Sequence, residues 1–549
     1  MKWQRVLALL LVIAMVTLLL GACTGAPGEE PEGEETEEPE ETEETEEPEE
    51  PTGPTSLVMA ASGAMGDVNP LVGLHLTACW VAINVHDTLV QKAHHMGPAG
   101  YLVEDTDNVE PGLATDWEIS DDDLTYTFNL REGVEFHDGS SLTADDVEFT
   151  FDLVLTVGAA ADYFSSVISE VEVVDSHTVK FHLNRVEPIF LQQLSTYHTC
   201  IMSKEAILRE AGEDPDAQMQ WLGSNLIGTG PYVMLEQMSD YVRFEANDDY
   251  WGGRPAIDEV SIQVVDEASS RRVLLERGDI DINVSPEKVN YEALDQNPDI
   301  DLVVRPSTTR IFYVGMNVAK PPFDDRRVRE AIAHAIPYED ILNVVLGGER
   351  YSVRARSILT SDMAAFVPVY DYEYDLDRAA ELLEEAGYGD GLQITWNSST
   401  AEQFVQIGTM LQAELAKIGV DMEVSPQSGA TYFPAGREGE FGLFFVSWWS
   451  RTGDPVDLID AIAHSSEFNR GNWVRLENDE LDELIELARV EMDVEQRNEY
   501  LREAQQILAD EMVYAVIYEG SVVYGMNKSV QGYVHYSDNL IRFDDLRIE

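Results

Sequence analysis

Residues 111–147 read PGLATDWEISDDDLTYTFNLREGVEFHDGSSLTADDV. After a turn signal at 120–123, apolar and polar side chains alternate over 124–130, which is typical of a half-buried strand. Thr143 is followed three positions later by Asp146, a pair that can satisfy the first free N–H groups of a helix. We therefore expect a turn, a strand and a capped helix here, with the acids shaping the scaffold rather than performing catalysis.

Strand and helix signals alternate through the rest of the chain. Apolar or alternating runs predict strands at 57–60, 171–174, 178–183 and 392–396. Helical periodicity with stop signals predicts helices at 326–336, 377–386 and 401–418, and one or two further helices at 488–509. No repeat of about 20–50 residues is visible, which argues against solenoids and propellers. The pattern indicates a mixed α/β protein.

The N-terminus has the order of an export signal. Lys2 and Arg5 precede an apolar run at 6–20, and Leu20-Gly21-Ala22-Cys23 resembles a bacterial lipobox. The run is shorter than the ~20 residues that cross a bilayer, which disfavours a spanning helix. We predict a lipoprotein signal peptide at 1–22 and lipidation of Cys23.

An acidic linker is predicted to follow the anchor. Residues 29–50 are Glu interrupted only by Pro, Thr and Gly, and such a segment buries nothing and repels itself. We therefore expect residues 23–56 to be the lipidated cysteine and a disordered spacer. The remaining body of about 490 residues exceeds the usual size of one core, so at least two domains are expected.

The charge balance excludes several kinds of partner. The chain has 103 acidic and 35 basic residues; without the 15 Glu of 29–50 and the bases Lys2 and Arg5, the body still carries about −55. Nucleic acid is excluded because nothing would neutralise its phosphates. Anionic lipid is disfavoured as a docking surface, so membrane contact is expected through the lipid anchor only. Solubility is the simplest reason for the acidity.

Cysteine and histidine usage indicates neither a disulfide scaffold nor a metal site. Besides Cys23 the chain has only Cys79 and Cys200, which form either one bridge or two buried thiols. His94-His95 has no third ligand at a useful spacing. No metal and no cofactor are expected.

The quoted stretch strongly resembles the peptide/nickel family of extracellular solute-binding proteins. Further motifs agree in order along nearly the whole body, at 66–70, 228–232, 247–251, 323–331, 382–388 and 453–455. The resemblance implies an α/β, two-lobed periplasmic-binding-protein-like fold with a hinge of crossing strands and an interlobe ligand cleft. It places lobe I at 57–308 plus 516–549, with an inserted subdomain around 91–190, and lobe II at 309–515.

The resemblance also implies a function without catalysis. Such a protein traps a small solute between its lobes and hands it to the permease subunits of an ATP-driven (ABC) transporter, as a monomer held in the cell envelope. The lipid anchor fits this role because tethering raises the receptor's effective concentration near the membrane complex. No catalytic residue is expected, so the chain is not predicted to be an enzyme.

The segment 447–455 supplies the first candidate ligand contacts. In peptide-binding members the place of Arg451 resembles one that holds an aspartate for the peptide's amino terminus; an arginine there would repel an ammonium group and could grip a carboxylate. Trp448 and Trp449 offer flat surfaces for stacking, and strand alternation predicts one in the core and the other in the cleft. Asp454 is a candidate whose alternative role is shaping the turn before Pro455.

Two other segments contribute weaker candidates. The family commonly lines its cleft with the extended run entering lobe II, where alternation groups residue 310 with 312 and residue 311 with 313. The opening loop would contribute from lobe I. The candidates are Arg310, Tyr313 and Asn317 from the extended run, and Met65, Asp67 and Asn69 from the loop.

The sequence is compatible with several ligands and roles. An oligopeptide or peptide-like solute is the leading ligand by family resemblance, an oligosaccharide is second because of the tryptophans and Arg451, and chelated nickel is third. A surface sensor or adhesin that no longer imports would carry the same sequence features. A secreted hydrolase is disfavoured because no Gly-x-Ser-x-Gly, His-Glu-x-x-His or phosphate-loop motif is present.

Overall fold

The computed structural model describes residues 54–549 except 64, 73–75, 97–101, 158–160 and 451. All the described elements belong to one compact unit, Gly53–Glu549. The predicted signal peptide, Cys23 and nearly all of the predicted linker lie outside the described residues. Thr55 and Ser56 already belong to the body, since Thr55 is hydrogen-bonded to Asp258 and Ser56 begins the first strand.

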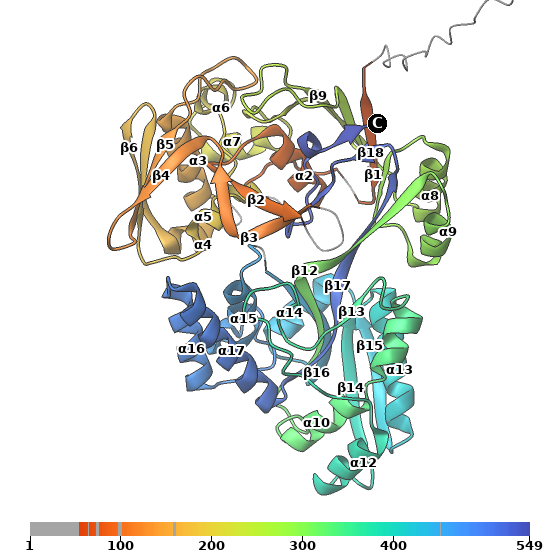
Figure 1. Cartoon of the computed structure of the whole chain (residues 1–549). Coiled ribbons are helices and arrows are strands. Elements are labelled where there is room, and N and C mark those ends of the chain that lie inside the picture. Colours follow the sequence, from red (N-terminus) through yellow and green to blue (C-terminus); the bar gives the residue numbers. More distant parts are fainter. Residues whose placement is uncertain (1–53, 64, 73–75, 97–101, 158–160, 451) are drawn as a thin grey trace, which may run out of the picture. The chain divides into compact units, whose positions relative to one another are not determined.

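Two long antiparallel strands form the centre of the fold. β12 (Ile300–Met316) pairs with β17 (Tyr514–Asn527) from Ile300 opposite Asn527 to Gly315 opposite Tyr514. Both strands pass between the two lobes (Figure 1). The predicted lobe boundaries, 308/309 and 515/516, fall inside β12 and β17, which we call the hinge strands.

One mixed sheet extends from this strand pair in both directions. Its order is β15-β14-β16-β12-β17-β11-β1-β10-β9-β8, with β13 also paired to β17. On the lobe I side the bounds are β11 (Ile282–Val284), β1 (Ser56–Ala61), β10 (Glu259–Val264), β9 (Tyr241–Ala246) and β8 (Tyr232–Gln237). On the lobe II side they are β16 (Leu443–Trp449), β14 (Leu392–Ser399), β15 (Val420–Gln427) and β13 (Val353–Arg354).

Lobe I carries three smaller sheets besides its part of the large one. Residues 111–147 contain β4 and β5 of a four-stranded sheet and the start of α3. Asp146 caps α3 by accepting the Thr143 N–H at 2.9 Å. The four-stranded sheet lies in the predicted inserted subdomain. The bounds are β4 (Ala114–Ile119), β5 (Thr125–Leu130), β7 (Thr178–Leu183) and β6 (Ile168–Asp175); β19 (Val534–His535), β3 (Leu102–Pro111) and β2 (Val90–Met96); and β18 (Val530–Gln531) with β20 (Arg547–Ile548).

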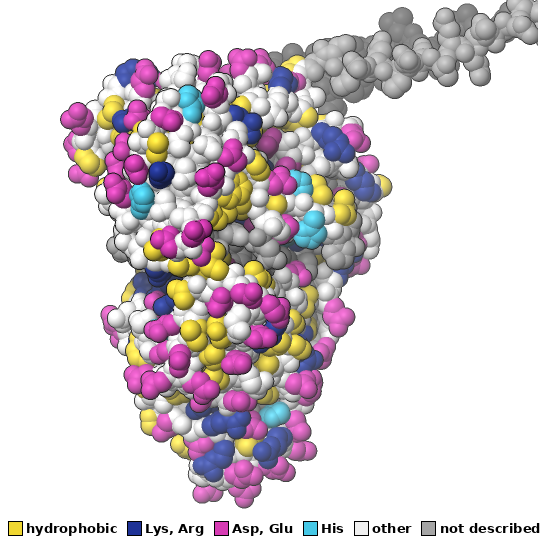
Figure 2. Space-filling model, turned by 60° about the vertical axis from the view of Figure 1, so that its left-hand side comes forward, with side chains coloured by type: hydrophobic (Ala, Val, Ile, Leu, Met, Phe, Trp, Pro, Cys, Tyr) yellow, Lys and Arg dark blue, Asp and Glu magenta, His cyan; other side chains and the backbone are white. Residues whose placement is uncertain are grey.

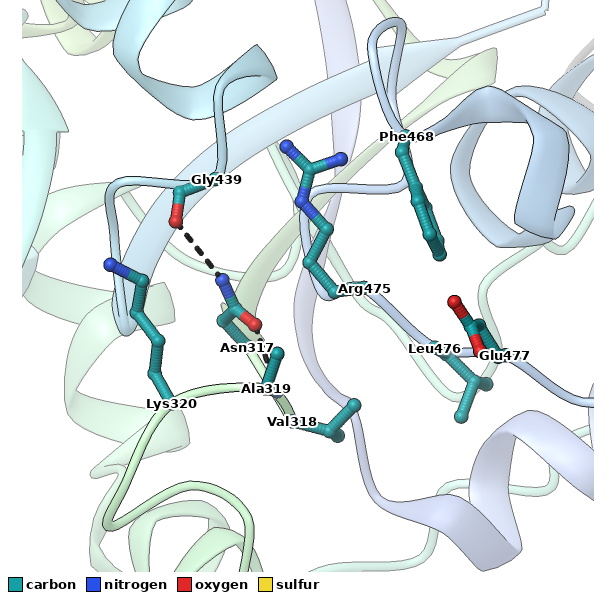
Figure 3. A pocket seen from close by; sticks show the side chains of 9 residues that line it. All are labelled: Asn317, Val318, Ala319, Lys320, Gly439, Phe468, Arg475, Leu476 and Glu477. Atoms are coloured by element: carbon teal, nitrogen blue, oxygen red, sulfur yellow. Dashed lines mark hydrogen bonds between the residues drawn. The ribbon is translucent and has the colours of Figure 1, made fainter.

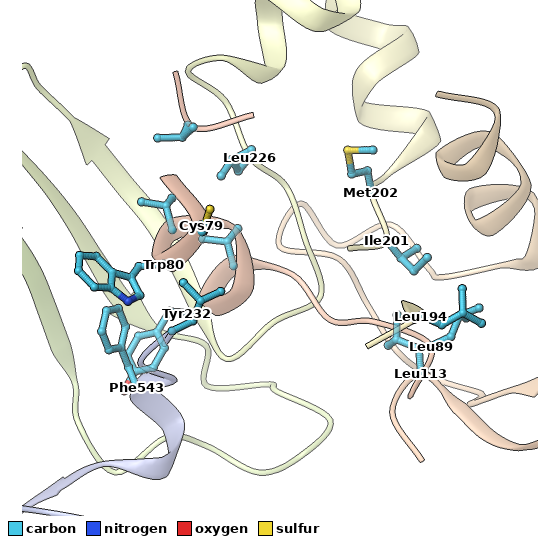
Figure 4. Close-up of a cluster of buried hydrophobic side chains, with 14 of the residues drawn as sticks. Cys79, Trp80, Leu89, Leu113, Leu194, Ile201, Met202, Leu226, Tyr232 and Phe543 are labelled. Carbon is cyan, nitrogen blue, oxygen red and sulfur yellow. The ribbon is translucent and has the colours of Figure 1, made fainter. Parts of the chain in front are cut away.

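Helices cover the sheets of lobe I. They are α2 (Leu76–Val85), α3 (Ala144–Thr156), α4 (Ala161–Val167), α5 (Phe190–Gln193), α6 (Lys204–Ala211), α7 (Pro215–Leu222), α8 (Ala268–Arg277) and α9 (Tyr291–Asp295), with short turns η1 (Tyr197–Thr199), η2 (Lys288–Asn290) and η5 (Phe543–Asp545). In the core shown in Figure 4, Trp80 of α2 lies near Tyr232 and Phe543. Because Phe543 packs on Tyr232 with ring centroids 5.8 Å apart, the C-terminal segment completes lobe I.

Helices cover both faces of the lobe II sheet. One face packs against α10 (Arg326–Ala335), α11 (Tyr338–Asp340), η3 (Ile341–Val345), α12 (Leu376–Glu385) and α13 (Glu402–Ala416). The other packs against α14 (Gly429–Arg437), α15 (Pro455–Ala463), α16 (Asp479–Val490) and α17 (Val494–Glu511), with η4 (Ser465–Glu467) after α15. The helical signal at 488–509 therefore belongs to two helices.

Cys79 and Cys200 are both buried free thiols, so no bridge joins them.

Candidate ligand-binding cleft

A cavity of about 950 Å³ lies where the lobes meet the hinge strands. Lobe I, the hinge and lobe II all contribute side chains to its wall, and many are aromatic. The aromatic lining residues are Tyr197 and Tyr291 from lobe I, Tyr524 from the lobe I end of β17, Phe312 and Tyr518 from the hinge, and Tyr351 and Trp449 from lobe II. A large, mostly apolar concavity with a few polar groups is the usual form of a small-molecule site.

One face of the hinge strands forms the cavity wall. Phe312 pairs with Tyr518 across β12 and β17, and Arg310 pairs with Trp449 across β12 and β16. Alternation places Arg310 and Phe312 on the same face, and all four side chains line the cavity. The Phe312 and Tyr518 rings stack with centroids 4.2 Å apart, which makes this part of the wall rigid and apolar.

Arg310 is the main electrostatic feature of the wall. Among the described residues it forms no salt bridge or side-chain hydrogen bond, and its guanidinium carbon lies 4.9 Å from the centroid of the Trp449 ring. The side chain is open to the cavity, yet protein surrounds it, and this desolvation lowers the pKa of its guanidinium while nearby Tyr518 opposes the shift. An arginine remains protonated under such conditions, so the cavity holds an uncompensated positive charge.

This charge contrasts with the surface of the protein. Acidic side chains are spread over the face shown in Figure 2, and the chain has a formal net charge of −68. A cation without an acidic partner inside such a protein is well placed to attract an anionic group into the cavity.

Two residues that line the same cavity carry a buried hydroxyl. Within the described part of the chain, the hydroxyls of Tyr518 and Ser352 make no hydrogen bond, and their residues are only 3% and 4% exposed. Buried polar groups in native proteins are nearly always paired, so an orphaned pair in a cavity wall points to a missing partner. Burial raises the pKa of the Tyr518 phenol far above its ordinary value, so this hydroxyl stays a hydrogen-bond donor.

The acid that lines the lobe I side of the cavity belongs to a neutral cluster of charges. Asp538 lines the cavity and lies 3.1 Å from Arg542 and 3.7 Å from Lys92, whose ammonium is 2.7 Å from Glu104. Burial would raise the pKa of Asp538, but Arg542 and Lys92 outweigh it and lower the pKa. Two acids and two bases thus neutralise one another beside the backbone N–H of Ser537, which donates to Glu104 at 2.7 Å.

The lobes touch on either side of the cavity. Lys288 of lobe I donates to the Val344 carbonyl of lobe II at 2.6 Å, and Asp295 accepts from Arg350 at 2.5 and 2.6 Å. On the other side, the Thr309 hydroxyl donates to the Ser537 carbonyl at 3.4 Å. The cavity is therefore bounded by contacts that an opening motion about the hinge would break.

The family is decided by comparison with known proteins. Residues 108–470 match the sequence profile described as "Bacterial extracellular solute-binding proteins, family 5 Middle". This chain belongs to that family. The dipeptide-binding protein of Escherichia coli K12 is 31% identical over 473 residues, covering 81% of this chain and 87% of that protein. Heme-binding protein A of Haemophilus influenzae is 29% identical over 455 residues, covering 78% of this chain and 82% of that protein.

Solved structures of similar proteins share the two-lobed fold. HbpA2 from Haemophilus parasuis has a TM-score of 0.80 at 27% identity and covers 90% of this chain and all of that one. The dipeptide-binding protein from Pseudoalteromonas sp. SM9913, in complex with Met-Leu, has a TM-score of 0.75 at 27% identity with the same coverage. The two-lobed periplasmic-binding-protein fold predicted from the resemblance is thus confirmed.

Two of the predicted ligand contacts line the cavity, and one lies outside the described residues. Arg310 and Trp449 face the cavity, and the neighbouring Ser450 lines it too. Trp448 instead packs against the core of lobe II, the division that strand alternation predicts. Arg451 is outside the described residues.

The remaining candidates have structural roles in the described fold. Asp454 caps α15 by accepting the Val456 N–H at 2.8 Å, and it pairs with both terminal nitrogens of Arg497 at 2.6 and 2.8 Å. Tyr313 is buried in the lobe II core, on the sheet face opposite Arg310. In the opening loop, Met65 lies in the lobe I core, Asp67 accepts the Asn69 N–H, and Asn69 is fully buried. None of these side chains lines the cavity, because local caps and core packing hold them elsewhere.

Asn317 lies at a second, open hollow of about 550 Å³ on lobe II (Figure 3). Its side-chain amide donates to the carbonyls of Gly439 and Phe441 at 3.4 and 3.0 Å, so it ties two chain segments together. Lys320 and Arg475 at this hollow also donate to backbone carbonyls, those of Glu440 and Arg437. These bonds indicate a structural role for the hollow.

The sequence did not reveal Tyr518, Ser352 or Gly520 as cavity residues. Tyr518 ends an apolar run at 514–518 that is typical of a buried core strand, and Ser352 and Gly520 carry no motif. The three come together only because β13 and β12 flank β17.

In the described part of the chain, no helix is both long and apolar enough to cross a bilayer. The same part contains no group of three or more His, Cys, Asp or Glu side chains arranged to hold a metal ion.

Proposed function

We propose that this chain is the lipid-anchored substrate-binding receptor of an ABC importer, which captures an oligopeptide or peptide-like solute between its lobes and delivers it to the permease subunits. The observation that carries the proposal is the cavity of about 950 Å³ with the uncompensated Arg310 in its wall. Capture by closure about a hinge explains why both lobes contribute to that wall.

A peptide-like solute is supported by the chemistry of the cavity and by the relatives. The E. coli relative is named a dipeptide-binding protein, and the Pseudoalteromonas structure contains Met-Leu. Aromatic walls suit apolar side chains, and Arg310 suits a carboxylate. The receptor role needs no catalytic group or cofactor, and we place the protein in the cell envelope as a monomer anchored through Cys23.

Arg310 and Trp449 are the residues we expect to touch the solute first. Trp449 supplies an exposed ring, 44% open, and Arg310 lies over it as a fixed cation. We propose Arg451 as a further contact, because Ser450 before it lines the cavity and Gly453 after it approaches Ser537 of lobe I.

A thermal-shift screen tests this function. The purified mature protein is heated with di-, tri- and tetrapeptides and, in parallel, with oligosaccharides of three to five sugars. A bound solute stabilises the folded state by mass action, by about 2.7 kcal/mol at a hundredfold excess over Kd. We expect stabilisation by peptides, confirmed by calorimetric titration. Stabilisation by sugars alone would overturn the peptide assignment, and stabilisation by neither would overturn both.

An oligosaccharide is the second candidate because of one observation. The Trp449 ring is exposed in the cavity, and tryptophan rings stack well on sugar faces.

A receptor that has lost import and acts as a sensor or adhesin would bind the same ligands. Deleting its gene in the source organism separates these roles, since loss of solute uptake supports an importer and normal uptake supports a sensor.

A further inference from the structure

Two exposed cations line the cavity without an acidic partner. Arg310 lies on the hinge strand β12, and Lys288 opens η2 of lobe I, where the two lobes touch. Both residues are exposed, and within the described part of the chain neither forms a salt bridge. Their charged groups are therefore available to a solute that enters the cavity.

The contacts that these two cations do make leave donors free. Arg310 lies 4.9 Å over the Trp449 ring and, among the described residues, makes no side-chain hydrogen bond. The Lys288 ammonium donates to the Val344 carbonyl at 2.6 Å, which uses one of its three donors. Each cation can therefore bind an anionic group while it keeps the contact that positions it.

The charge of the cavity wall is opposite to that of the protein. The chain has 103 acidic and 35 basic residues, about three acids for each base. The described lining residues instead include two cations, Arg310 and Lys288, and one acid, Asp538. That acid is already neutralised, since it lies 3.1 Å from Arg542 and 3.7 Å from Lys92. The described part of the wall therefore carries a net positive charge.

This distribution of charge favours one sign of charge on the solute. A cavity lined by one sign of charge attracts groups of the other sign, and its low dielectric strengthens the attraction. A cationic group would meet Arg310 and Lys288 as like charges and would find no free acid among the described lining residues. Its burial is unfavourable for both reasons.

We propose that the cavity selects peptide-like solutes with a net negative charge, and that Arg310 and Lys288 are the residues that select them. This inference rests on the proposed solute-binding function and adds the sign of the solute's charge to it. The two cations lie on different elements, so they suit a solute with two anionic groups, such as the terminal and side-chain carboxylates of an acidic peptide.

Peptides that differ in one charge test the proposal. Three series of tri- and tetrapeptides carry Glu, Gln or Lys at the same position, and each peptide is titrated calorimetrically into the mature protein. Because Glu and Gln have nearly the same shape, the difference between their affinities reports the charge. We expect the Glu peptides to bind at least about tenfold more tightly than the Gln peptides, and the Lys peptides to bind most weakly.

The outcomes separate the charge selection from the receptor function. Equal affinities for the Glu and Gln peptides, or tighter binding of the Lys peptides, would overturn the selection of anions and leave a peptide receptor intact. Binding of no peptide in any of the three series would overturn the receptor function as well.

Substitution of the two cations locates the selection. Arg310→Gln and Lys288→Gln each remove one charge from an exposed side chain, so the fold should be kept. We expect each variant to reduce the preference for Glu over Gln peptides at least about threefold, and the double variant to abolish it. A preference that the folded double variant keeps in full would contradict selection by these residues.

Two cations outside the cavity are matched controls. Arg131 lies 4.3 Å over the Trp251 ring and forms no salt bridge with the described residues. Lys528 donates to the Pro298 carbonyl at 2.5 Å, as Lys288 donates to a carbonyl of lobe II. Arg131→Gln and Lys528→Gln remove the same formal charge, and we expect both to keep the preference. An equal loss of preference in the controls would show that only the total charge matters, which would overturn the assignment.

Discussion

Trp448 and Trp449 are neighbours in the chain with different surroundings. Trp448 is half-buried against the lobe II core, while Trp449 is 44% exposed in the cavity under Arg310. We expect Trp448→Ala to lower the free energy of unfolding by about 2 kcal/mol, because packed surface is lost. Trp449→Ala should lower it by less than about 1 kcal/mol but weaken solute binding at least tenfold or so. Urea unfolding and calorimetric titration of both variants measure the difference; equal stability losses would contradict it.

Glu519 places a titratable group in the hinge. It is only 2% exposed, accepts the Ser361 hydroxyl at 2.8 Å and pairs with Ile311 on the sheet face turned away from the cavity. Burial raises the pKa of this carboxyl from 4.5 to about 7, with nearby Asp362 adding to the rise. The folded state then favours the protonated form, so the stability that Glu519 contributes is fully present below pH ~4.5 and is lost as the pH rises through about 7.

Glu519→Gln tests this pH dependence. The amide cannot ionise, so the variant should be more stable than the natural protein at pH 8, and the gain should shrink towards pH 5. The expected change in this gain is roughly 2–3 kcal/mol, as 1.36 kcal/mol per pKa unit predicts. Urea unfolding at several pH values measures it, with the exposed Glu384→Gln as control. A gain that does not vary with pH would contradict the raised pKa.

At the scale of elements, α15 is held at its start by a buried ion pair. Asp454 caps the helix and pairs with Arg497 of α17, and both side chains are nearly buried. Asp454→Ala removes the cap and leaves a buried arginine unpaired, which we expect to cost about 3–5 kcal/mol. Asp454→Asn keeps a good capping residue and should cost less. Thermal unfolding ranks the two variants; equal melting temperatures would show that the cap contributes nothing.

At the level of the whole body, polar contacts join the two lobes; in the proposed receptor they stabilise the closed state. Arg350 and Asp295 join the lobes by a half-exposed ion pair, which is worth less than about 1 kcal/mol because water screens it. Arg350→Glu replaces attraction with repulsion and should raise the Kd of the best ligand from the peptide screen about three- to tenfold. The double variant Asp295→Arg, Arg350→Glu should restore affinity, and salt should weaken the single variant's effect. An unrestored double variant would rule out a charge effect.

The predicted lipid anchor at Cys23 would fix where the whole protein is found in the cell. We predict that Cys23→Ser moves the protein from the membrane fraction to the soluble fraction of the cell, because no acyl chains can be attached. The melting temperature and peptide affinity should not change. Fractionation with immunodetection measures the distribution, and a protein still in the membrane fraction would contradict a lipid anchor.

Much of the fold follows from local sequence patterns. Alternation at 124–130 and the Thr143–Asp146 pair predict β5 and the start of α3, because both depend on neighbouring residues. The pattern at 488–509 predicted one or two helices, and the structure decides for two, since α16 ends at Val490 and α17 begins at Val494. Cys79 and Cys200 could not be assigned as free thiols, since pairing depends on distance in space.

Motif order and strand alternation are local properties, and from them the family, the mixed α/β class and the opposite facing of Trp448 and Trp449 could be predicted. Alternation did not say which of the two tryptophans faces the cavity, and Arg310 was one of several candidates. The make-up of the cavity wall depends on tertiary contacts. Gly520, Ser352 and Tyr518 reach Arg310 through strand pairing between segments far apart in the chain, and Asp454 and Tyr313 were drawn into a cap and a core. A cleft between lobes is built by long-range contacts, and no local pattern encodes which side chains will face across it.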